Sequence, residues 1–188
     1  MISEAEFIND LISSKTREKA FNKLLNLYQE RLYWHIRKIV ITHDNANDVL
    51  QNTFIRIYKN LSNFKQKSSL HTWMFRIAYN ESIRFLEQHK NKNYLSIDNS
   101  DTNYMNTLVE DSYFEGNEIQ LRLQKLLSKI PEKQRHIFQM KYYDELKFNE
   151  MSTILGIKES TLKSSYYTTV KYIENNINNV ELLVKNEI

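Results

Sequence analysis

Only two glycines, Gly116 and Gly156, and one proline, Pro131, occur in a chain of 188 residues. Sheets depend on tight turns, which are built largely from these two residue types, so a β-sandwich or a doubly wound sheet would need many more of them. Hydrophobic residues make up 41% of the chain, which is too much for a disordered protein and enough for a buried core. The sequence therefore predicts an all-α protein.

The composition also excludes several kinds of chemistry. The chain has no cysteine, so it can form no disulfide, thiol nucleophile or iron–sulfur cluster. Its two glycines lie too far apart for a phosphate-binding loop, and its five histidines never occur in the His-Glu-x-x-His spacing of a zinc site. We therefore expect no metal, no cofactor and no enzymatic activity.

Membrane and export segments are also not expected. No apolar stretch is long enough to span a bilayer, and the first ten residues are too acidic and too polar for a signal peptide. These features predict a cytoplasmic protein with no membrane insertion.

The distribution of charge predicts the domain organisation. Residues 1–95 hold 15 basic and 9 acidic residues, residues 96–118 hold six acidic residues and no basic one, and residues 119–188 hold 11 basic and 8 acidic residues. The middle segment is also rich in Asn, Ser and Asp, as linkers are. We predict two small basic helical domains, 1–95 and 119–188, joined by an acidic flexible linker, 96–118.

Apolar residues at three-and-four spacing predict the helices of the first domain, over residues 21–40, about 45–61 and about 70–89. Residues 42–44 offer capping side chains before the second of these helices. The predicted buried side of the third helix comprises Leu70, Met74, Ile77, Ala78 and Phe85. We expect the three helices to pack as a compact bundle.

The second domain begins with an amphipathic helix that ends at Pro131, a residue that fits the first turn of the next helix, which runs to about Tyr143. A short helix over residues 149–155 ends at Gly156, and the last helix starts after Glu159. Two helices joined by a short turn with a glycine form a helix-turn-helix unit.

The last helix carries a polar outer face. Its members are mainly hydroxyl-bearing and basic: Ser160, Thr161, Lys163, Ser164, Tyr167 and Lys171. In a DNA-binding helix-turn-helix, early residues of the second helix reach base edges in the major groove, and lysines neutralise phosphates. A plain helical hairpin with a solvated face would give the same pattern.

The third helix has a second unusual face, formed by Trp73, Arg76, Asn80 and Arg84. The loop before it adds Phe64, Lys65, Lys67, Ser68 and His71. Bases of a single strand stack on aromatic rings while cations follow its backbone, so this set suits single-stranded nucleic acid. The alternative is that Trp73 belongs to the core and the arginines only solubilise the helix.

The second helix exposes a mixed face with Asp48, Gln51, Asn52, Ile55 and Tyr58. Exposed apolar residues among polar ones favour a protein contact over a purely solvated surface.

Three stretches of the chain resemble the extracytoplasmic-function (group IV) sigma factors of bacterial RNA polymerase. DNANDVLQNTF, from residue 44, is similar to the family's Asp-Ala-x-Asp-Leu-Val-Gln-Glu-x-Phe helix. TWMFRIAYN, from residue 72, is similar to its Thr-Trp-Leu-Phe-Arg-Ile-Ala-x-Asn helix. The third stretch, residues 127–173, is similar to the family's last segment, which opens with Leu-Pro-x-x-Gln-Arg (here IPEKQR, from residue 130) and ends with Ile-Ala-x-x-Leu-Gly-x-x-x-x-Thr-Val-Lys-Ser (here MSTILGIKESTLKS, from residue 151).

The resemblance implies a role for each face. Asp48, Gln51, Asn52 and Ile55 would dock on the β′ clamp helices of core polymerase, and the helix after Pro131 on the β flap. The Trp73 helix and the loop before it would read the −10 element and hold its strands apart, while the last helix would read the −35 element. The acidic linker would thread the path of nascent RNA. An anti-sigma factor is a further partner that the family implies.

Three positions depart from the family pattern. The family usually has Glu at the position of Asn52, and Arg at the positions of Ser165 and Thr168. Fewer phosphate contacts predict a shallower salt dependence of −35 binding.

Two other functions fit the residues less fully: a stand-alone helix-turn-helix regulator that binds duplex DNA as a dimer, and a helical adaptor with protein contacts only.

Overall fold

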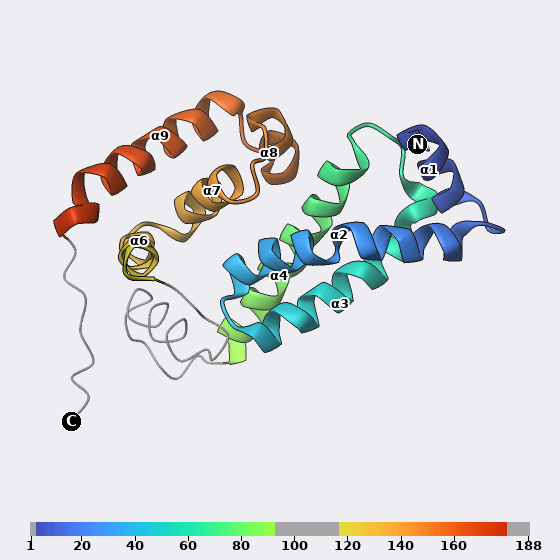
Figure 1. Ribbon diagram of the computed structural model, residues 1–188, viewed down its shortest axis with the longest axis horizontal. Coiled ribbons are helices and arrows are strands. Elements are labelled where there is room, and N and C mark those ends of the chain that lie inside the picture. The colour runs from blue at the N-terminus through green and yellow to red at the C-terminus, as the bar shows by residue number, and fades with distance from the viewer. Residues whose placement is uncertain (1–2, 93–116, 180–188) are drawn as a thin grey trace. The chain divides into compact units, whose positions relative to one another are not determined.

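The computed structural model describes residues 3–92 and 117–179 (Figure 1). Within these ranges every regular element is helical, which confirms the predicted all-α class. The chain divides into two compact units, and each is described by itself. The predicted linker lies outside the described residues except for Asn117 and Glu118, which begin the first helix of the second unit.

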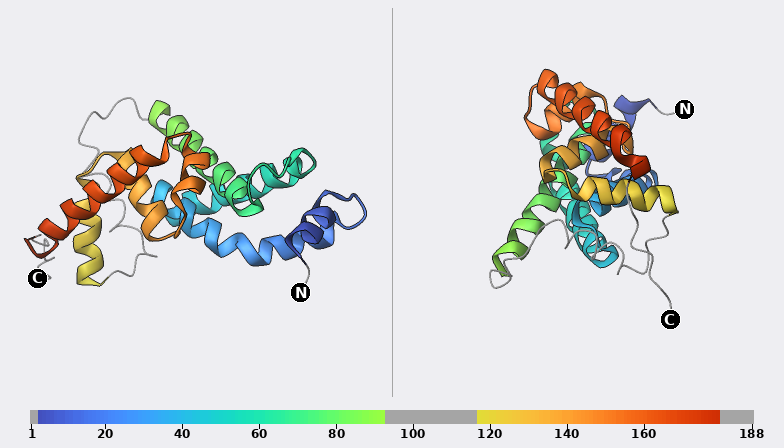
Figure 2. Two further views of the ribbon diagram at one scale, coloured as in Figure 1. Left: turned by 90° about the horizontal axis from the view of Figure 1, so that it is seen from above. Right: turned by 90° about the vertical axis from the view of Figure 1, so that its left-hand side faces the viewer.

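The first unit contains α1 (Glu4–Ile12), α2 (Arg17–Val40), α3 (His43–Asn60), the short 3-10 helix η1 (Leu61–Asn63) and α4 (Leu70–Lys92). Helices α2, α3 and α4 each pack against the other two, and α1 packs on α2 (Figure 2). Their shared core is apolar and includes Leu24, Leu32, Ile36, Val49, Ile57, Met74 and Ala78. The predicted three-helix bundle is therefore present.

Local capping explains where several of these helices begin. The Thr42 hydroxyl accepts a hydrogen bond from the backbone N–H of Asn45 at the start of α3. The Ser69 hydroxyl accepts one from the N–H of Thr72 at the start of α4. Each bond satisfies a backbone donor that has no partner inside the helix. These are the polar segments that the sequence placed between helices.

Helix α1 was not among the predicted elements. Ser3 and Glu6 form a capping box, in which the Ser3 hydroxyl accepts from the Glu6 N–H and the Glu6 carboxylate accepts from the Ser3 N–H. The Glu6 carboxylate also accepts from the Ser3 hydroxyl, and its two hydrogen bonds from Ser3 lower the pKa of Glu6. Ile8 and Leu11 of α1 are buried. The Ser-x-x-Glu spacing at residues 3–6 was the signal that could have predicted this helix.

The buried side of α4 differs in part from the prediction. Leu70, Met74 and Ala78 are buried as expected, but Ile77 and Phe85 are only half-buried. Phe75, which was not predicted to be buried, is 1% exposed, and its ring lies 4.8 Å from that of His35 on α2. Because α4 contacts both α2 and α3, its buried surface is wider than a single apolar stripe.

The described residues after the linker, 117–179, form α6 (Glu118–Ser128), α7 (Glu132–Tyr142), α8 (Phe148–Leu155), α9 (Glu159–Asn176) and the short 3-10 helix η2 (Ile177–Asn179). All but Thr153–Gly156 belong to the second unit. Its core is formed by Leu127, Ile130 and Phe138, with Tyr166, Val170 and Ile173 packed against them. Pro131 is the N-cap of α7 and not a residue of its first turn. The proline still marks the start of that helix.

Helices α8 and α9 form the predicted helix-turn-helix. Gly156 begins the turn between them with a φ of 68°, in the left-handed region that glycine adopts without strain. Met151 and Ile154 of α8 and Leu162 of α9 are buried.

No helix in the described ranges is both long and apolar enough to cross a membrane.

Candidate functional site

Trp73, Arg76, Asn80 and Arg84 lie at successive turns of α4 and are called the Trp73 face. Arg76, Asn80 and Arg84 are exposed, and Trp73 is half-buried. The Trp73 ring lies against Phe64, with centroids 4.9 Å apart and planes inclined by 41°. The indole is therefore supported by the core on one side and remains partly accessible.

The loop before α4 contributes less to this surface than the sequence predicted. Lys65 and Lys67 are exposed and Ser68 is half-buried, but Phe64 is only 7% exposed. Phe64 is thus a core residue under Trp73 and not part of the accessible loop. His71, which was predicted to lie in this loop, is the second residue of α4. It is half-buried between aromatic rings, 4.2 Å from Phe75 and 6.0 Å from Tyr28 between centroids.

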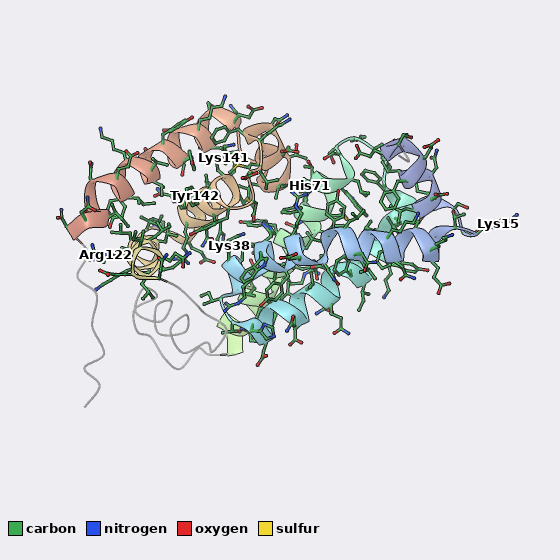
Figure 3. The ribbon with its side chains drawn as sticks, viewed as in Figure 1. Lys15, Lys38, His71, Arg122, Lys141 and Tyr142 are labelled. Carbon is green, nitrogen blue, oxygen red and sulfur yellow. The ribbon has the colours of Figure 1, made fainter. Side chains whose placement is uncertain are left out.

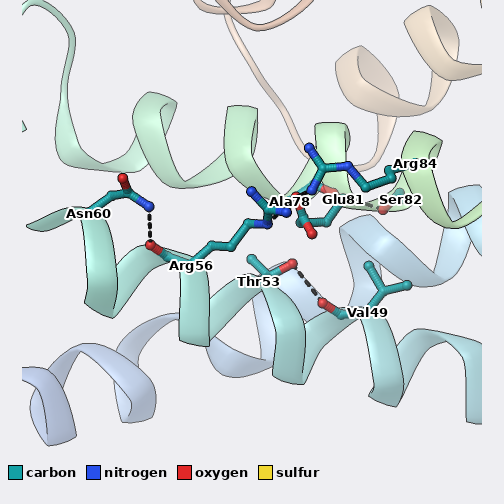
Figure 4. A network of polar contacts seen from close by, with 8 residues as sticks. All are labelled: Val49, Thr53, Arg56, Asn60, Ala78, Glu81, Ser82 and Arg84. Atoms are coloured by element: carbon teal, nitrogen blue, oxygen red, sulfur yellow. Dashed lines mark hydrogen bonds and ion pairs between the residues drawn. The ribbon is translucent and has the colours of Figure 1, made fainter.

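Arg84 belongs to a group of three ionic side chains that sequence reasoning did not identify. Its Nη1 lies 2.9 Å from Oε1 of Glu81, and the same oxygen lies 2.7 Å from Nε of Arg56 on α3 (Figure 4). The three-residue spacing of Glu81 and Arg84 was a signal for their ion pair. Arg56 could not be found in this way, because its contact with Glu81 depends on the packing of α3 against α4.

The face of α3 predicted to bind protein is accessible along its length. Asp48, Gln51 and Asn52 are exposed, and Ile55 is 45% exposed. Tyr58, one turn further on, is also exposed, and its ring packs edge-on against Phe21 of α2 at 4.9 Å. One carboxylate, two amides and two apolar side chains therefore share one outer face, Asp48, Gln51, Asn52, Ile55 and Tyr58, which we call the α3 face.

All six predicted residues of the last helix are exposed: Ser160, Thr161, Lys163, Ser164, Tyr167 and Lys171. We call this surface the α9 face. Tyr167 is 61% exposed, whereas the neighbouring Tyr166 packs against the core, and burial raises the pKa of Tyr166. Of the two family-arginine positions, Thr168 is exposed, while the side-chain oxygen of Ser165 is buried.

Phe148, the first residue of α8, is a contact of the α9 face that sequence reasoning missed. The ammonium groups of Lys141 and Lys163 lie 5.3 and 5.8 Å from the centre of its ring. Lys141 projects from the end of α7, next to Tyr142 (Figure 3). Such cation–π contacts contribute about 0.5–1 kcal/mol at exposed sites, so Phe148 limits the motion of Lys163.

Among the described residues, no group of three or more His, Asp or Glu side chains is arranged to hold a metal ion. The accessible groups of the Trp73 face and the α9 face are instead cations, amides, hydroxyls and aromatic rings. These groups can bind phosphates, base edges and base planes without a chemical step.

Comparison with known proteins gives a consistent match for both units. Residues 24–92 match the family model described as sigma-70 region 2, and residues 120–171 match sigma-70 region 4. The chain is 28% identical to the ECF RNA polymerase sigma factor SigW of Bacillus subtilis, over 80% of this chain and 84% of that protein. It is 26% identical to SigM of the same organism, over 76% of this chain and 86% of that protein.

A solved structure supports the same fold. The sigma factor RpoE of Bartonella quintana, crystallised with the anti-sigma factor NepR, superposes with a TM-score of 0.68 at 18% identity, over 87% of this chain and 99% of that one. The two matched regions include most of α2 through α4 and most of α6 through α9. The chain therefore belongs to the extracytoplasmic-function group of the sigma-70 family, whose members direct RNA polymerase to promoters.

Proposed function

We propose that this sigma factor docks on core polymerase through the α3 face, captures the separated −10 strand on the Trp73 face and reads the −35 element with the α9 face. The observation that supports this most strongly is the partly accessible ring of Trp73, on the same helix as exposed Arg76, Asn80 and Arg84. A protein that reads only duplex DNA needs no such combination of a stacking ring and neighbouring cations.

The Trp73 face would use binding energy to stabilise open DNA. Extruding a base costs a few kcal/mol, and stacking it on an aromatic ring returns about 1–3 kcal/mol. Arg76 and Arg84 would add contacts to the strand backbone, and Asn80 could hydrogen-bond a base edge. On this proposal the protein opens DNA without ATP and catalyses no reaction of its own.

The α9 face would bind intact duplex. Small hydroxyl side chains at 160, 161 and 164 let the helix approach the major groove closely, and Lys163 and Lys171 would contact phosphates. Tyr167 is exposed enough to meet a thymine methyl group. With Ser165 and Thr168 where the family usually has Arg, this interface would lose less affinity as salt rises.

The partners follow from the same assignment. They are core polymerase, through its β′ clamp helices and β flap, and promoter DNA, so the protein would act in the cytoplasm. The related RpoE was solved with an anti-sigma factor, and we propose a partner of that class for this chain.

The test compares two DNAs that differ only in strand separation. Core polymerase with this protein is titrated with a promoter duplex and with the same sequence carrying a mismatched −10 bubble. The proposal predicts tighter binding to the bubble by at least about tenfold, and no preference with core polymerase alone. A preference for the duplex would instead support a helix-turn-helix regulator. Failure to bind either DNA or polymerase at low salt would leave only the adaptor.

A further inference from the structure

The ion-paired trio of Arg56, Glu81 and Arg84 joins α3 to α4 through one carboxylate oxygen. The Glu81 side chain is only 10% exposed, whereas those of Arg56 and Arg84 are 47% and 45% exposed. An almost buried carboxylate thus holds two half-exposed guanidinium groups side by side (Figure 4).

The trio keeps a net charge of +1, and most of its guanidinium N–H groups are not used by the contacts with Glu81. Each guanidinium carries five N–H groups, and the contact with Glu81 uses one of them on each arginine. Ion pairs whose cations are this exposed add little to stability, about 0–1 kcal/mol. The arrangement is better suited to presenting two fixed cations to an anion than to holding the helices together.

We propose that Arg56 and Arg84 together bind one backbone phosphate of the separated promoter strand, with Glu81 as the positioning residue for both. This inference rests on the proposed function, because Arg84 belongs to the Trp73 face. A phosphate is favoured because two planar guanidinium groups can share its oxygens, and because the neighbouring Asn80 and Arg76 suit a strand that continues along α4. A carboxylate of polymerase facing Arg56 is the competing partner.

Glu81 has two opposite effects, and they can be separated. Its charge repels DNA, so simple electrostatics predicts that Glu81→Gln strengthens binding to the strand. Its ion pair with Arg56 and its hydrogen-bonded ion pair with Arg84 hold both guanidinium groups in place. The positioning role therefore predicts that the same change weakens binding, despite the loss of a negative charge. The sign of the effect therefore distinguishes the two.

The experiment uses the polymerase holoenzyme and forked promoter DNA in which single phosphates of the separated strand are replaced by neutral methylphosphonates. We expect one position at which the replacement weakens binding by wild type by about tenfold or more, as for loss of charge-assisted hydrogen bonds. Arg56→Gln and Arg84→Gln should bind the unmodified fork more weakly than wild type, and the methylphosphonate at that position should weaken their binding little further. Each should also reduce the salt slope by about 0.7 for every phosphate charge that it no longer neutralises. Glu81→Gln should bind several-fold more weakly and show a reduced methylphosphonate effect.

Matched controls lie on the same helices. Lys59→Gln removes an exposed cation one turn from Arg56, and Glu87→Gln removes an exposed carboxylate from α4; both should keep the full methylphosphonate effect. Arg84→Lys keeps the charge but loses the planar fork, and should recover only part of the affinity. Thermal unfolding of each variant shows whether it is folded.

Three results would overturn the inference. Glu81→Gln could bind the fork more tightly than wild type, which would exclude the positioning role. Arg56→Gln could keep the methylphosphonate effect while losing affinity for core polymerase, which would make Arg56 a polymerase contact. Both arginine variants could keep the full methylphosphonate effect, as the control variants should, which would mean that neither arginine binds that phosphate. If wild-type holoenzyme did not prefer forked DNA over duplex, that result would contradict the proposed function itself and not only this inference.

Discussion

The ring of Phe64, which is 7% exposed, supports the half-buried ring of Trp73 at a centroid distance of 4.9 Å. The two residues come from different segments, since Phe64 follows η1 and Trp73 lies in the first turn of α4. Packing against a buried neighbour restricts the rotamers of Trp73 before any ligand is present. A base that stacks on Trp73 therefore contacts a ring that is already ordered, so binding loses less side-chain conformational entropy.

Trp73→Ala should reduce promoter opening while leaving polymerase binding close to normal. Loss of one stacked base is expected to cost about 1–3 kcal/mol, a fall of roughly 5- to 150-fold in the ratio of open to closed promoter. Permanganate reactivity of thymines beside the −10 element measures this population. Trp34→Ala, which removes the other tryptophan, 51% exposed on α2, is the matched control and should leave reactivity unchanged. Undiminished reactivity in Trp73→Ala would exclude a role in strand capture.

Asp48→Arg should weaken docking on core polymerase. The side chain is exposed at the N-terminal end of the α3 face, so reversing its charge changes electrostatic complementarity without removing core packing. We expect a loss of about tenfold or more in affinity, measured with labelled sigma factor. Glu30→Arg makes the same charge change on the exposed side of α2 and should have little effect. Full retention of Asp48→Arg by core polymerase would remove this face from the interface.

Asn52→Glu should act in the opposite direction. The family usually places a carboxylate at this exposed position, so the substitution restores a charge to the α3 face. Tighter docking than wild type is expected in the same assay. Unchanged affinity would mean that the polymerase surface opposite residue 52 does not respond to the charge.

Thr168→Arg should steepen the salt dependence of −35 binding. Thr168 is exposed on α9, so an arginine there can reach a phosphate, and one added contact changes the slope by about 0.9 for duplex DNA. Binding to a −35 duplex across a salt series measures it. Asn175→Arg adds the same charge near the end of α9 and should not change the slope. An unchanged slope in Thr168→Arg would mean that position 168 faces away from DNA.

Gly156→Ala should destabilise the helix-turn-helix through backbone conformation. The residue has a φ of 68°, and an added Cβ would meet no atom within 4 Å, so steric clash contributes nothing. The left-handed conformation costs an L-residue about 1–2 kcal/mol. Denaturant unfolding should show a loss of about that size, and Gly156→Asn a smaller one, because asparagine tolerates this conformation better. Equal stability of Gly156→Ala and wild type would contradict the turn geometry.

The helices could be predicted from the sequence because their apolar spacing and their caps agree. Thr42 caps α3, Pro131 marks the start of α7 and Gly156 begins the turn before α9, as expected from local chemistry. Helix α1 was missed because its apolar pattern is short, although Ser3 and Glu6 carried a capping signal. The burial of Phe75 depends on α4 packing against two helices at once, which one helical stripe does not encode.

The residues of the candidate site could be predicted from the sequence where all residues of a face lie on one helix. The residues predicted for each face, and not the residues between them, are accessible at the positions that helical spacing gave them: Asp48, Gln51, Asn52 and Ile55 on α3, Arg76, Asn80 and Arg84 on α4, and Ser160, Thr161, Lys163, Ser164, Tyr167 and Lys171 on α9. The contacts that cross between helices were not predictable. Arg56 meets Glu81 only because α3 packs on α4, and Phe148 meets Lys163 only through the helix-turn-helix.

The most direct test of the account adds the purified protein to core RNA polymerase on genomic DNA and sequences the 5′ ends of the transcripts. The account predicts a defined set of start sites that appears only with the protein, each preceded by shared −35 and −10 sequences. Trp73→Ala should reduce these transcripts at every such site. An identical set of 5′ ends with and without the protein would contradict the central claim.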